Sequence, residues 1–266
     1  MPTNTATPPP PRIAIVQPRM HWSGDDNLAS ALRALERAAR AGAAMCLFPE
    51  MTVPGFHRRV AEGARPPLVE GWLRALEAHA ARHRVHVAVG APAFADDGRI
   101  FNSHWLIDDA GRRVAVVHKR GLTDPEATFF ARGQGRPVVD WGGLRASVVI
   151  CREVEDFDDV VAELEAERPE LLLWPGMMGP EDGQEAIDPP RHVQQAQALA
   201  RRLGAWVLQS NWPESLNVPE NSARTGHSAV IAPDGRLLLR LPRAEAGIGV
   251  FDLGQPDCHW LPEPFA

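Results

Sequence analysis

Short apolar runs rich in valine, isoleucine and leucine recur along this chain, and the segments between them change from its first half to its second. Early runs at 12–17, 45–48 and 85–90 are separated by amphipathic segments at 27–42 and 68–84, whose apolar residues have helical spacing. Later runs are joined by turn sequences such as D-D-A-G-R and P-D-G-R, which predict hairpins. Strands linked first by helices and then by hairpins predict a mixed α/β domain. Its sheets should be covered by helices rather than form a simple doubly wound sheet.

The later elements follow from the same patterns. Helices are predicted at 153–168 and 190–203, and the acidic run from Glu153 to Glu170 is interpreted as a solvated helix face. No repeat or linker composition interrupts residues 12–266, which we expect to form one domain after a disordered tail at 1–11. The remaining predicted strands are 103–108, 112–118, 146–150, 171–174, 205–209, 227–232, 236–241 and 248–252.

Composition excludes several classes of partner. A net charge of −6 over 266 residues provides no basic field for nucleic acid or anionic lipid. No apolar run approaches the roughly 18 residues of a membrane span, and the N-terminal residues lack the pattern of a secretory signal. The three cysteines, Cys46, Cys151 and Cys258, cannot all pair. We therefore expect a soluble, reduced, cytoplasmic protein with no nucleic-acid or membrane partner.

Among the 28 basic side chains, only Lys119 is a lysine. Arginine stays protonated in proteins and spreads its charge over a planar fork, whereas lysine is a compact charge whose pKa the protein can tune. Lys119 is therefore a candidate for a chemical task that arginine cannot perform, although compositional bias alone could also leave one lysine. Its surroundings in the sequence decide between these interpretations.

Three reactive residues each follow a predicted strand: Glu50 in L-F-P-E, Lys119 in V-A-V-V-H-K and Cys151 in A-S-V-V-I-C. Strand ends at one edge of a sheet converge, so these side chains could meet. A free thiol with a pKa near 8.5 is only about 3% ionised at neutral pH and needs a base or a cation to become a nucleophile. A carboxylate can serve as the base, and an ammonium can stabilise an oxyanion. The trio thus suits acyl transfer without histidine.

These residues and their flanks resemble the nitrilase superfamily of carbon–nitrogen hydrolases. The first motif is L-F-P-E-M-T-V-P-G-F with Glu50, and the second is H-K-R-G-L-T-D-P-E-A-T-F-F-A-R-G with Lys119 and Glu126. The third is V-V-I-C-R-E with Cys151, and L-L-L-W-P-G-M, V-L-Q-S-N-W and G-H-S-A-V-I-A-P-D-G-R-L-L also agree. Each motif alone is weak, but their order and spacing match the family from about residue 12 to about residue 253.

The resemblance implies an α/β fold, a four-layer α-β-β-α sandwich, and hydrolysis of a non-peptide C–N bond through a thioester. It implies that Glu50 is the general base, Cys151 the nucleophile and Lys119 the oxyanion stabiliser, helped by the backbone N–H of Arg152. Glu126 resembles the family's second glutamate, which holds the lysine. Members of this family use no metal and no organic cofactor, and helices after the nucleophile often form a dimer interface. A homodimer or higher homo-oligomer is therefore expected.

The chain departs from its relatives beside the nucleophile, where many amidases have C-Y-D and nitrile hydrolases have C-W-E. Arg152 replaces the aromatic residue, while Glu153 matches the nitrile hydrolases' acid. Gly121 stands where a histidine is common. Arg152 could bind a substrate carboxylate or could instead pair with Glu153 or Glu155, which we favour. Trp174, Met177 and Asn211 are further candidate substrate-binding residues, with packing as the alternative for each.

The leading functional prediction is a hydrolase that releases ammonia or an amine from a small amide or an N-carbamoyl compound. The chain is short beside typical nitrile hydrolases, which favours amides mildly. A nitrile hydrolase, converting a nitrile to an acid and ammonia, is the alternative among enzymes. A binding protein that keeps the fold without turnover is the alternative from another class, because the nucleophile motif is altered.

Overall fold

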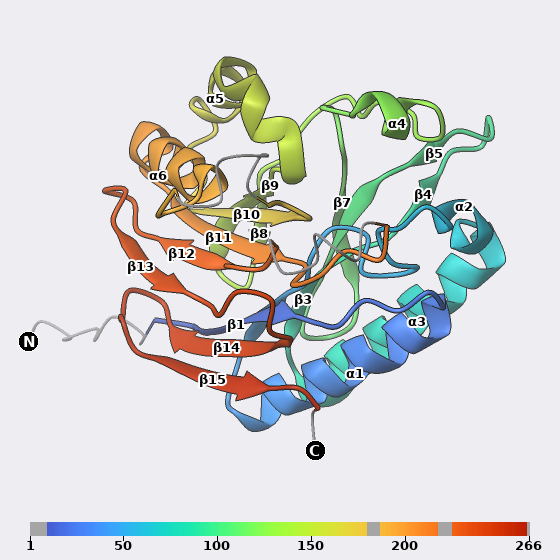
Figure 1. Cartoon of the computed structure of the whole chain (residues 1–266), viewed down its shortest axis with the longest axis horizontal. Coiled ribbons are helices and arrows are strands. Elements are labelled where there is room, and N and C mark those ends of the chain that lie inside the picture. Colours follow the sequence, from blue (N-terminus) through green and yellow to red (C-terminus); the bar gives the residue numbers. More distant parts are fainter. Residues whose placement is uncertain (1–9, 180–186, 218–224, 265–266) are drawn as a thin grey trace, which may run out of the picture.

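Two mixed sheets form the centre of the molecule, as a computed structural model of the chain shows (Figure 1). The structure describes residues 10–179, 187–217 and 225–264. The predicted tail at 1–11 falls almost wholly on residues 1–9, which lie outside the described residues, and it stays a prediction. No helix within the described ranges is long and apolar enough to cross a membrane.

The first sheet has seven strands in the order β15-β14-β1-β2-β3-β6-β7. Strands β1, β2 and β3 are mutually parallel in register, and the flanking pairs are antiparallel. Since β6 reverses the direction of β3 and β7 reverses it again, the carboxyl ends of β2, β3 and β7 lie at one edge. The bounds are β1 Arg12–Gln17, β2 Met45–Leu47, β3 His86–Gly90, β6 Ser103–Ile107, β7 Arg113–His118, β14 Gly247–Asp252 and β15 Cys258–Pro262.

The second sheet has six strands in the order β13-β12-β11-β10-β9-β8. Its central strands β9, β10 and β11 are parallel, and hairpins extend it on both sides. The bounds are β8 Val139–Trp141, β9 Leu144–Val148, β10 Leu171–Gly176, β11 Trp206–Asn211, β12 Ala229–Ile231 and β13 Leu237–Arg240. A small hairpin, β4 Ala93–Phe94 with β5 Ile100–Phe101, precedes β6.

Helices cover the outer face of each sheet, which completes four layers. Helices α1 and α3 lie against the first sheet, and α5 and α6 lie on the opposite side of the molecule against the second (Figure 1). The helix bounds are α1 Gly24–Arg40, α2 Val60–Gly63, α3 Pro66–His83, α4 Asp124–Ala127, α5 Phe157–Leu164 and α6 Arg191–Leu203, with a 3₁₀ helix η1 at Cys151–Asp156. The predicted four-layer α-β-β-α sandwich is therefore confirmed.

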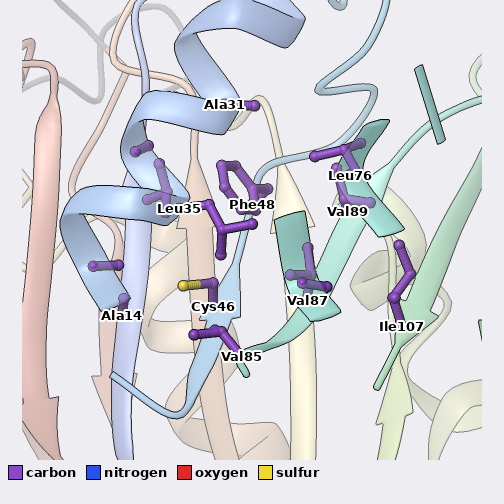
Figure 2. Close-up of a cluster of buried hydrophobic side chains, with 14 of the residues drawn as sticks. Ala14, Ala31, Leu35, Cys46, Phe48, Leu76, Val85, Val87, Val89 and Ile107 are labelled. Atoms are coloured by element: carbon purple, nitrogen blue, oxygen red, sulfur yellow. The ribbon is translucent and has the colours of Figure 1, made fainter. Parts of the chain in front are cut away.

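Alternation along the strands assigns side chains to different layers. In β1, Ala14 and Val16 face the helices α1 and α3, while Ile13 and Ile15 pack against the second sheet. Figure 2 shows the helix-side cluster, in which Leu35 of α1 lies close to residues of β2. Because both faces of the central strands are buried, they are continuous apolar runs rather than alternating ones.

The predicted elements match the structure closely in the first half, where α1 and α3 begin within three residues of their expected starts. The prediction was wrong at 153–168, where no single helix forms. A 3₁₀ turn comes first and α5 begins only at Phe157. The strand predicted at 146–150 is Leu144–Val148 instead, so Ile150 lies after the strand, next to Cys151. The sequence patterns did not predict strands β4, β5, β8 and β15 or the short helices α2 and α4.

Candidate active site

Glu50 lies directly after β2, on a backbone segment packed tightly against the end of β3. A Cβ on Gly90 would stand 2.2 Å from the Met51 nitrogen, so only glycine allows this approach. The Trp212 indole N–H donates to the Glu50 carbonyl at 2.7 Å. These contacts fix the backbone of a glutamate whose side chain is 0% exposed.

Lys119 follows β7 at the same edge of the first sheet, and its ammonium lies among carboxylates. Nζ donates to Glu50 Oε1 at 2.7 Å and to both oxygens of Glu126, at 2.7 and 2.9 Å. The side chain is 1% exposed. The Phe56 ring, with its centroid 5.8 Å from Nζ, contributes an aromatic face on a further side. The structure thus brings Glu50 and Glu126 together around the Lys119 ammonium.

Asn102 connects the two glutamates and was not singled out from the sequence. Its side-chain amide donates to Glu50 Oε1 at 2.8 Å and to Glu126 Oε1 at 3.0 Å. The backbone carbonyl of Asn102 accepts a hydrogen bond from the backbone N–H of Lys119. Asn102 lies between the short strand β5 and β6, in a position that resembles an ordinary turn in sequence. A buried carboxylate needs hydrogen-bond donors. A polar residue next to the apolar residues Ile100 and Phe101 was the sign in the sequence that Asn102 could be such a donor.

The two glutamates differ in their remaining partners. Glu126 Oε2 accepts hydrogen bonds from the Thr123 N–H and hydroxyl, at 2.9 and 3.0 Å, in the capping box of α4. Glu50 Oε2 is buried and has no partner among the described residues. One carboxylate is thus saturated, and the other keeps a free acceptor.

Cys151 begins the 3₁₀ helix η1, which follows β9 in the second sheet. Its φ of 52° places it in the left-handed region, which is uncommon for a residue with a Cβ. The Trp174 indole N–H donates to the Cys151 carbonyl at 2.8 Å, and the thiol lies 4.0 Å from the Met177 carbonyl. Strain held in this way at a strand end is characteristic of reactive residues.

The ionisation of Cys151 is coupled to the charges of the first sheet. Burial and then the negative charge of Glu50 raise the pKa of the thiol to about 12, although Lys119 lowers it. Burial opposes the charge on Lys119, but Glu50, a Cys151 thiolate and Glu126 together raise its pKa above the ordinary value. All four groups are therefore close enough to influence one another, and Lys119 stays charged.

The two carboxyl groups respond in opposite directions. Burial raises the pKa of Glu50, against the lowering effect of Lys119. Burial also opposes ionisation of Glu126, but the Lys119 charge and the Thr123 hydrogen bonds lower its pKa below the usual value. The pKa values of the two carboxyl groups are therefore shifted apart, upward for Glu50 and downward for Glu126.

Arg152 lies beside the cysteine, but its guanidinium already has partners. Its nitrogen atoms lie 3.4 Å from a Glu155 oxygen, 3.5 Å from an Asp156 oxygen and 3.3 Å from the Leu122 carbonyl. Of the two pairings expected as alternatives to carboxylate binding, with Glu153 or Glu155, the structure has the one with Glu155.

The interpretation of Glu153 as part of a solvated helix face was wrong. The side chain is 0% exposed and turns back from η1 into the protein. Its Oε2 accepts a hydrogen bond from the Ile150 N–H at 2.6 Å, and its Oε1 accepts hydrogen bonds from the backbone N–H groups of Arg120 and Gly121. The tight turn at Cys151 redirects this residue, which helical periodicity could not reveal.

The other candidate substrate-binding residues occupy different situations. Trp174 is 0% exposed and uses its indole N–H on the Cys151 carbonyl, while Met177 is partly exposed. Asn211, also 0% exposed, bonds through its amide to the backbone of Met178 and Gly226. Trp174 and Asn211 therefore hold the backbone around the thiol, and their contact with substrate stays a prediction, as does that of Met177.

A cavity of about 390 Å³ adjoins Glu126 and Phe56. Its walls are mainly apolar, with an aromatic side formed by Phe129 and Phe130 and a polar rim that includes Arg58. No group of three or more His, Cys, Asp or Glu side chains placed to hold a metal occurs within the described ranges.

Comparison with known proteins identifies the family to which the chain belongs. The profile of the carbon–nitrogen hydrolase family matches residues 12–260. A nitrilase of Pseudomonas syringae pv. syringae (strain B728a) is 24% identical over 228 residues, covering 76% of this chain and 68% of that protein. An arylacetonitrilase of Aspergillus niger (strain ATCC MYA-4892 / CBS 513.88 / FGSC A1513) is 27% identical over 271 residues, covering 91% of this chain and 80% of that protein.

Among solved structures, an amidase of the nitrilase superfamily from Nesterenkonia AN1 superposes with a TM-score of 0.78 at 25% identity. The match covers 95% of this chain and 93% of that one. Another structure of the Nesterenkonia amidase, with acrylamide added to its active-site cysteine, superposes at 0.76, also at 25% identity, with 91% and 92% covered. With most of its length matched by the family profile, this chain belongs to the carbon–nitrogen hydrolase family of the nitrilase superfamily.

Proposed function

We propose that this protein is an amidase-type hydrolase that cleaves the C–N bond of a small amide or N-carbamoyl compound through a Cys151 thioester. The observation that carries the proposal is the buried Lys119 ammonium, bonded to Glu50 and Glu126 and electrostatically coupled to Cys151. The similarity to an amidase of the nitrilase superfamily from Nesterenkonia AN1, at 25% identity, supports the amide substrate class.

In the proposed mechanism, Glu50 accepts the thiol proton as Cys151 attacks the carbonyl carbon. The resulting oxyanion is stabilised by Lys119 and by the backbone N–H of Arg152, in a site where one such donor contributes roughly 3–4 kcal/mol. Glu50 then protonates the leaving nitrogen, the C–N bond breaks, and the thioester remains. Water deprotonated by Glu50 attacks the thioester, releasing the acid and regenerating the thiol.

Substrate class can be tested by measuring ammonia or amine release from amides, N-carbamoyl amino acids and nitriles. Conversion of at least one amide, with an acyl adduct on Cys151 seen by intact-mass spectrometry, is the expected result. Conversion of nitriles alone would replace the amidase by a nitrile hydrolase, which the similarity to the two nitrilases keeps as the second candidate. No turnover and no adduct with any class would favour a binding protein.

The acid side of the pH profile should report on Glu50. Because burial raises the pKa of Glu50, the base becomes protonated at a higher pH than an ordinary glutamate. We therefore expect kcat/KM to fall as the pH decreases through a midpoint above about 4.5. The Glu50→Gln variant should be much less active and should lack this acid limb. A wild-type midpoint below 4 would contradict the assignment of Glu50 as base.

Arg152 should contribute little to substrate selection, because Glu155, Asp156 and a backbone carbonyl already surround its guanidinium. We expect Arg152→Leu to change KM for acidic and neutral amides alike, by no more than about threefold. Steady-state kinetics with a matched pair of amides, one with a carboxylate and one without, tests this. A selective rise in KM for the acidic amide would instead make Arg152 a carboxylate-binding residue.

The structure describes one chain, so the expected homodimer or higher homo-oligomer stays a prediction.

A further inference from the structure

The Glu153 carboxylate is enclosed by backbone donors from two separate segments. Its Oε2 accepts the Ile150 N–H at 2.6 Å, and its Oε1 accepts the Arg120 N–H at 2.5 Å and the Gly121 N–H at 3.2 Å. The side chain is 0% exposed. A buried carboxylate with donors on both oxygens is well satisfied and rigidly oriented.

These donors are the immediate neighbours of two proposed reacting groups. Ile150 precedes Cys151, and Arg120 follows Lys119. The first segment continues β9 of the second sheet, and the other continues β7 at the edge of the first sheet. One carboxylate therefore connects the two sheets at the level of the site.

A buried cation balances the Glu153 charge. Arg136, itself 5% exposed, places Nη2 3.1 Å from Glu153 Oε1. The same guanidinium pairs with Glu163 of α5, which is 22% exposed and also pairs with the Arg120 side chain. The charge of Glu153 is thus compensated without either Lys119 or Cys151, so its effect on them must be geometric.

Packing around Gly121 shows how closely the two segments approach. A Cβ on Gly121 would stand 3.2 Å from the Glu153 Cα and 2.7 Å from an Asp156 carboxylate oxygen. A side chain at this position would push the turn that carries Cys151 away from the strand end that carries Lys119. The absence of a Cβ on Gly121 is what lets its N–H reach Glu153.

We propose that Glu153 is a positioning residue that sets the separation of Cys151 from Lys119 by binding the backbone N–H groups next to each. The effect of Glu153 on catalysis rests on the proposed function. Its effect on the reactivity of the Cys151 thiol does not, and can be tested without turnover. Glu153 touches neither substrate nor the reacting atoms in this role.

Replacing the carboxylate by an amide removes one acceptor while preserving size. In Glu153→Gln, the amide –NH₂ group takes the place of one carboxylate oxygen and is itself a donor, so it cannot accept a hydrogen bond from a backbone N–H. Either the bond from Ile150 or the bonds from Arg120 and Gly121 are therefore lost. The turn then relaxes relative to Lys119. A displacement of about 1 Å can cost on the order of 10²-fold in rate, so we expect a loss of that size in kcat. KM should change by less than about threefold, because Glu153 does not touch the substrate in the proposed role.

The matched control is Glu163→Gln, which removes a charge from the same cluster but leaves every backbone bond of Glu153 in place. It should retain kcat within about twofold of wild type. Two measurements are made on the wild type and on each variant: amide hydrolysis, and the second-order rate of Cys151 alkylation by iodoacetamide, located by peptide mass spectrometry. In Glu153→Gln, both the rate of hydrolysis and the rate of alkylation should fall. Thermal unfolding of each variant is measured as well, to separate a loss of stability from a loss of reactivity.

Equal kcat and alkylation rates in wild type and Glu153→Gln would overturn the proposal, as would an equal loss in Glu163→Gln. If Glu153→Gln fails to fold, Gly121→Ala takes its place. It keeps every charge and displaces Glu153 by contact, and it should lower both rates in the same direction. A folded Gly121→Ala protein with wild-type rates would equally refute the role. A wild-type enzyme without turnover but with a Cys151 alkylation rate that depends on Glu153 would reject the proposed function alone.

Discussion

Substitution of Cys151 by alanine should reduce amide hydrolysis by on the order of 10⁴-fold or more, because no other group in the site can form the thioester. Glu50 and Lys119 remain in Cys151→Ala and could still activate water, but removing the nucleophile of a cooperative constellation eliminates nearly the whole rate enhancement. Product release under substrate saturation, together with the loss of any acyl adduct by intact-mass spectrometry, measures the effect.

The other two cysteines provide matched controls for this substitution. Cys46 is wholly buried in β2, and burial raises its pKa. Cys258 lies in β15, away from the edge that carries Glu50 and Lys119, and burial raises its pKa as well. Cys258→Ala should therefore keep near wild-type activity. Residual hydrolysis in Cys151→Ala above one-tenth of wild type would show that the reaction does not proceed through this sulfur.

Substitution of Lys119 by methionine should affect both activity and stability. The ammonium that is proposed to bind the oxyanion disappears, and Glu50 loses the partner that orients it. We expect kcat to fall by on the order of 10³-fold, since loss of a single oxyanion donor already costs 10²–10³-fold.

The stability loss in Lys119→Met follows from the two carboxylates that remain. Glu50 and Glu126 are both buried and would share only Asn102 and the Thr123 groups as donors. Leaving buried charge without its partner typically costs about 3–5 kcal/mol in the free energy of unfolding at neutral pH.

This loss should decrease as the pH falls. Without the ammonium, the folded-state pKa of the carboxylate pair lies above its unfolded value, so proton uptake favours the folded variant at low pH and this support disappears as the pH rises. Chemical denaturation at two pH values measures the difference. The control is Arg12→Met, which removes an exposed, solvent-screened ion pair with Asp252 and should lower the free energy of unfolding far less than Lys119→Met does. A Lys119→Met protein as stable as Arg12→Met would contradict the buried network.

The positions of the three proposed catalytic residues could be predicted because each of them follows a clear strand signal. Glu50, Lys119 and Cys151 each end an apolar run, and strand ends at sheet edges are where side chains converge. These signals did not determine at which edge of which sheet each of the three residues lies. Strand order depends on long-range pairing, and here Cys151 follows a strand of the second sheet, whereas Glu50 and Lys119 follow strands of the first.

The supporting residues were harder to predict because their roles depend on three-dimensional contact. Asn102 resembles a turn residue in sequence, and Glu153 resembles the start of an amphipathic acidic helix. Both are buried in the structure, since Asn102 bridges two glutamates and Glu153 turns back at a left-handed cysteine. Helical periodicity describes residues that continue a helix, and it does not apply at a sharp turn where the chain changes direction.

The division of the reactive groups between two sheets also bears on how this protein would lose activity under stress. Each sheet can keep its own ladder of hydrogen bonds while the apolar contacts between the layers weaken, because those contacts are made by side chains such as Ile13, Leu47 and Leu173. Heat, pressure or mild denaturant would then separate sulfur from amine while circular dichroism still reported folded strands. We therefore expect activity to be lost before the strands unfold, and substitutions that fill the core between the sheets should raise the temperature at which activity is lost.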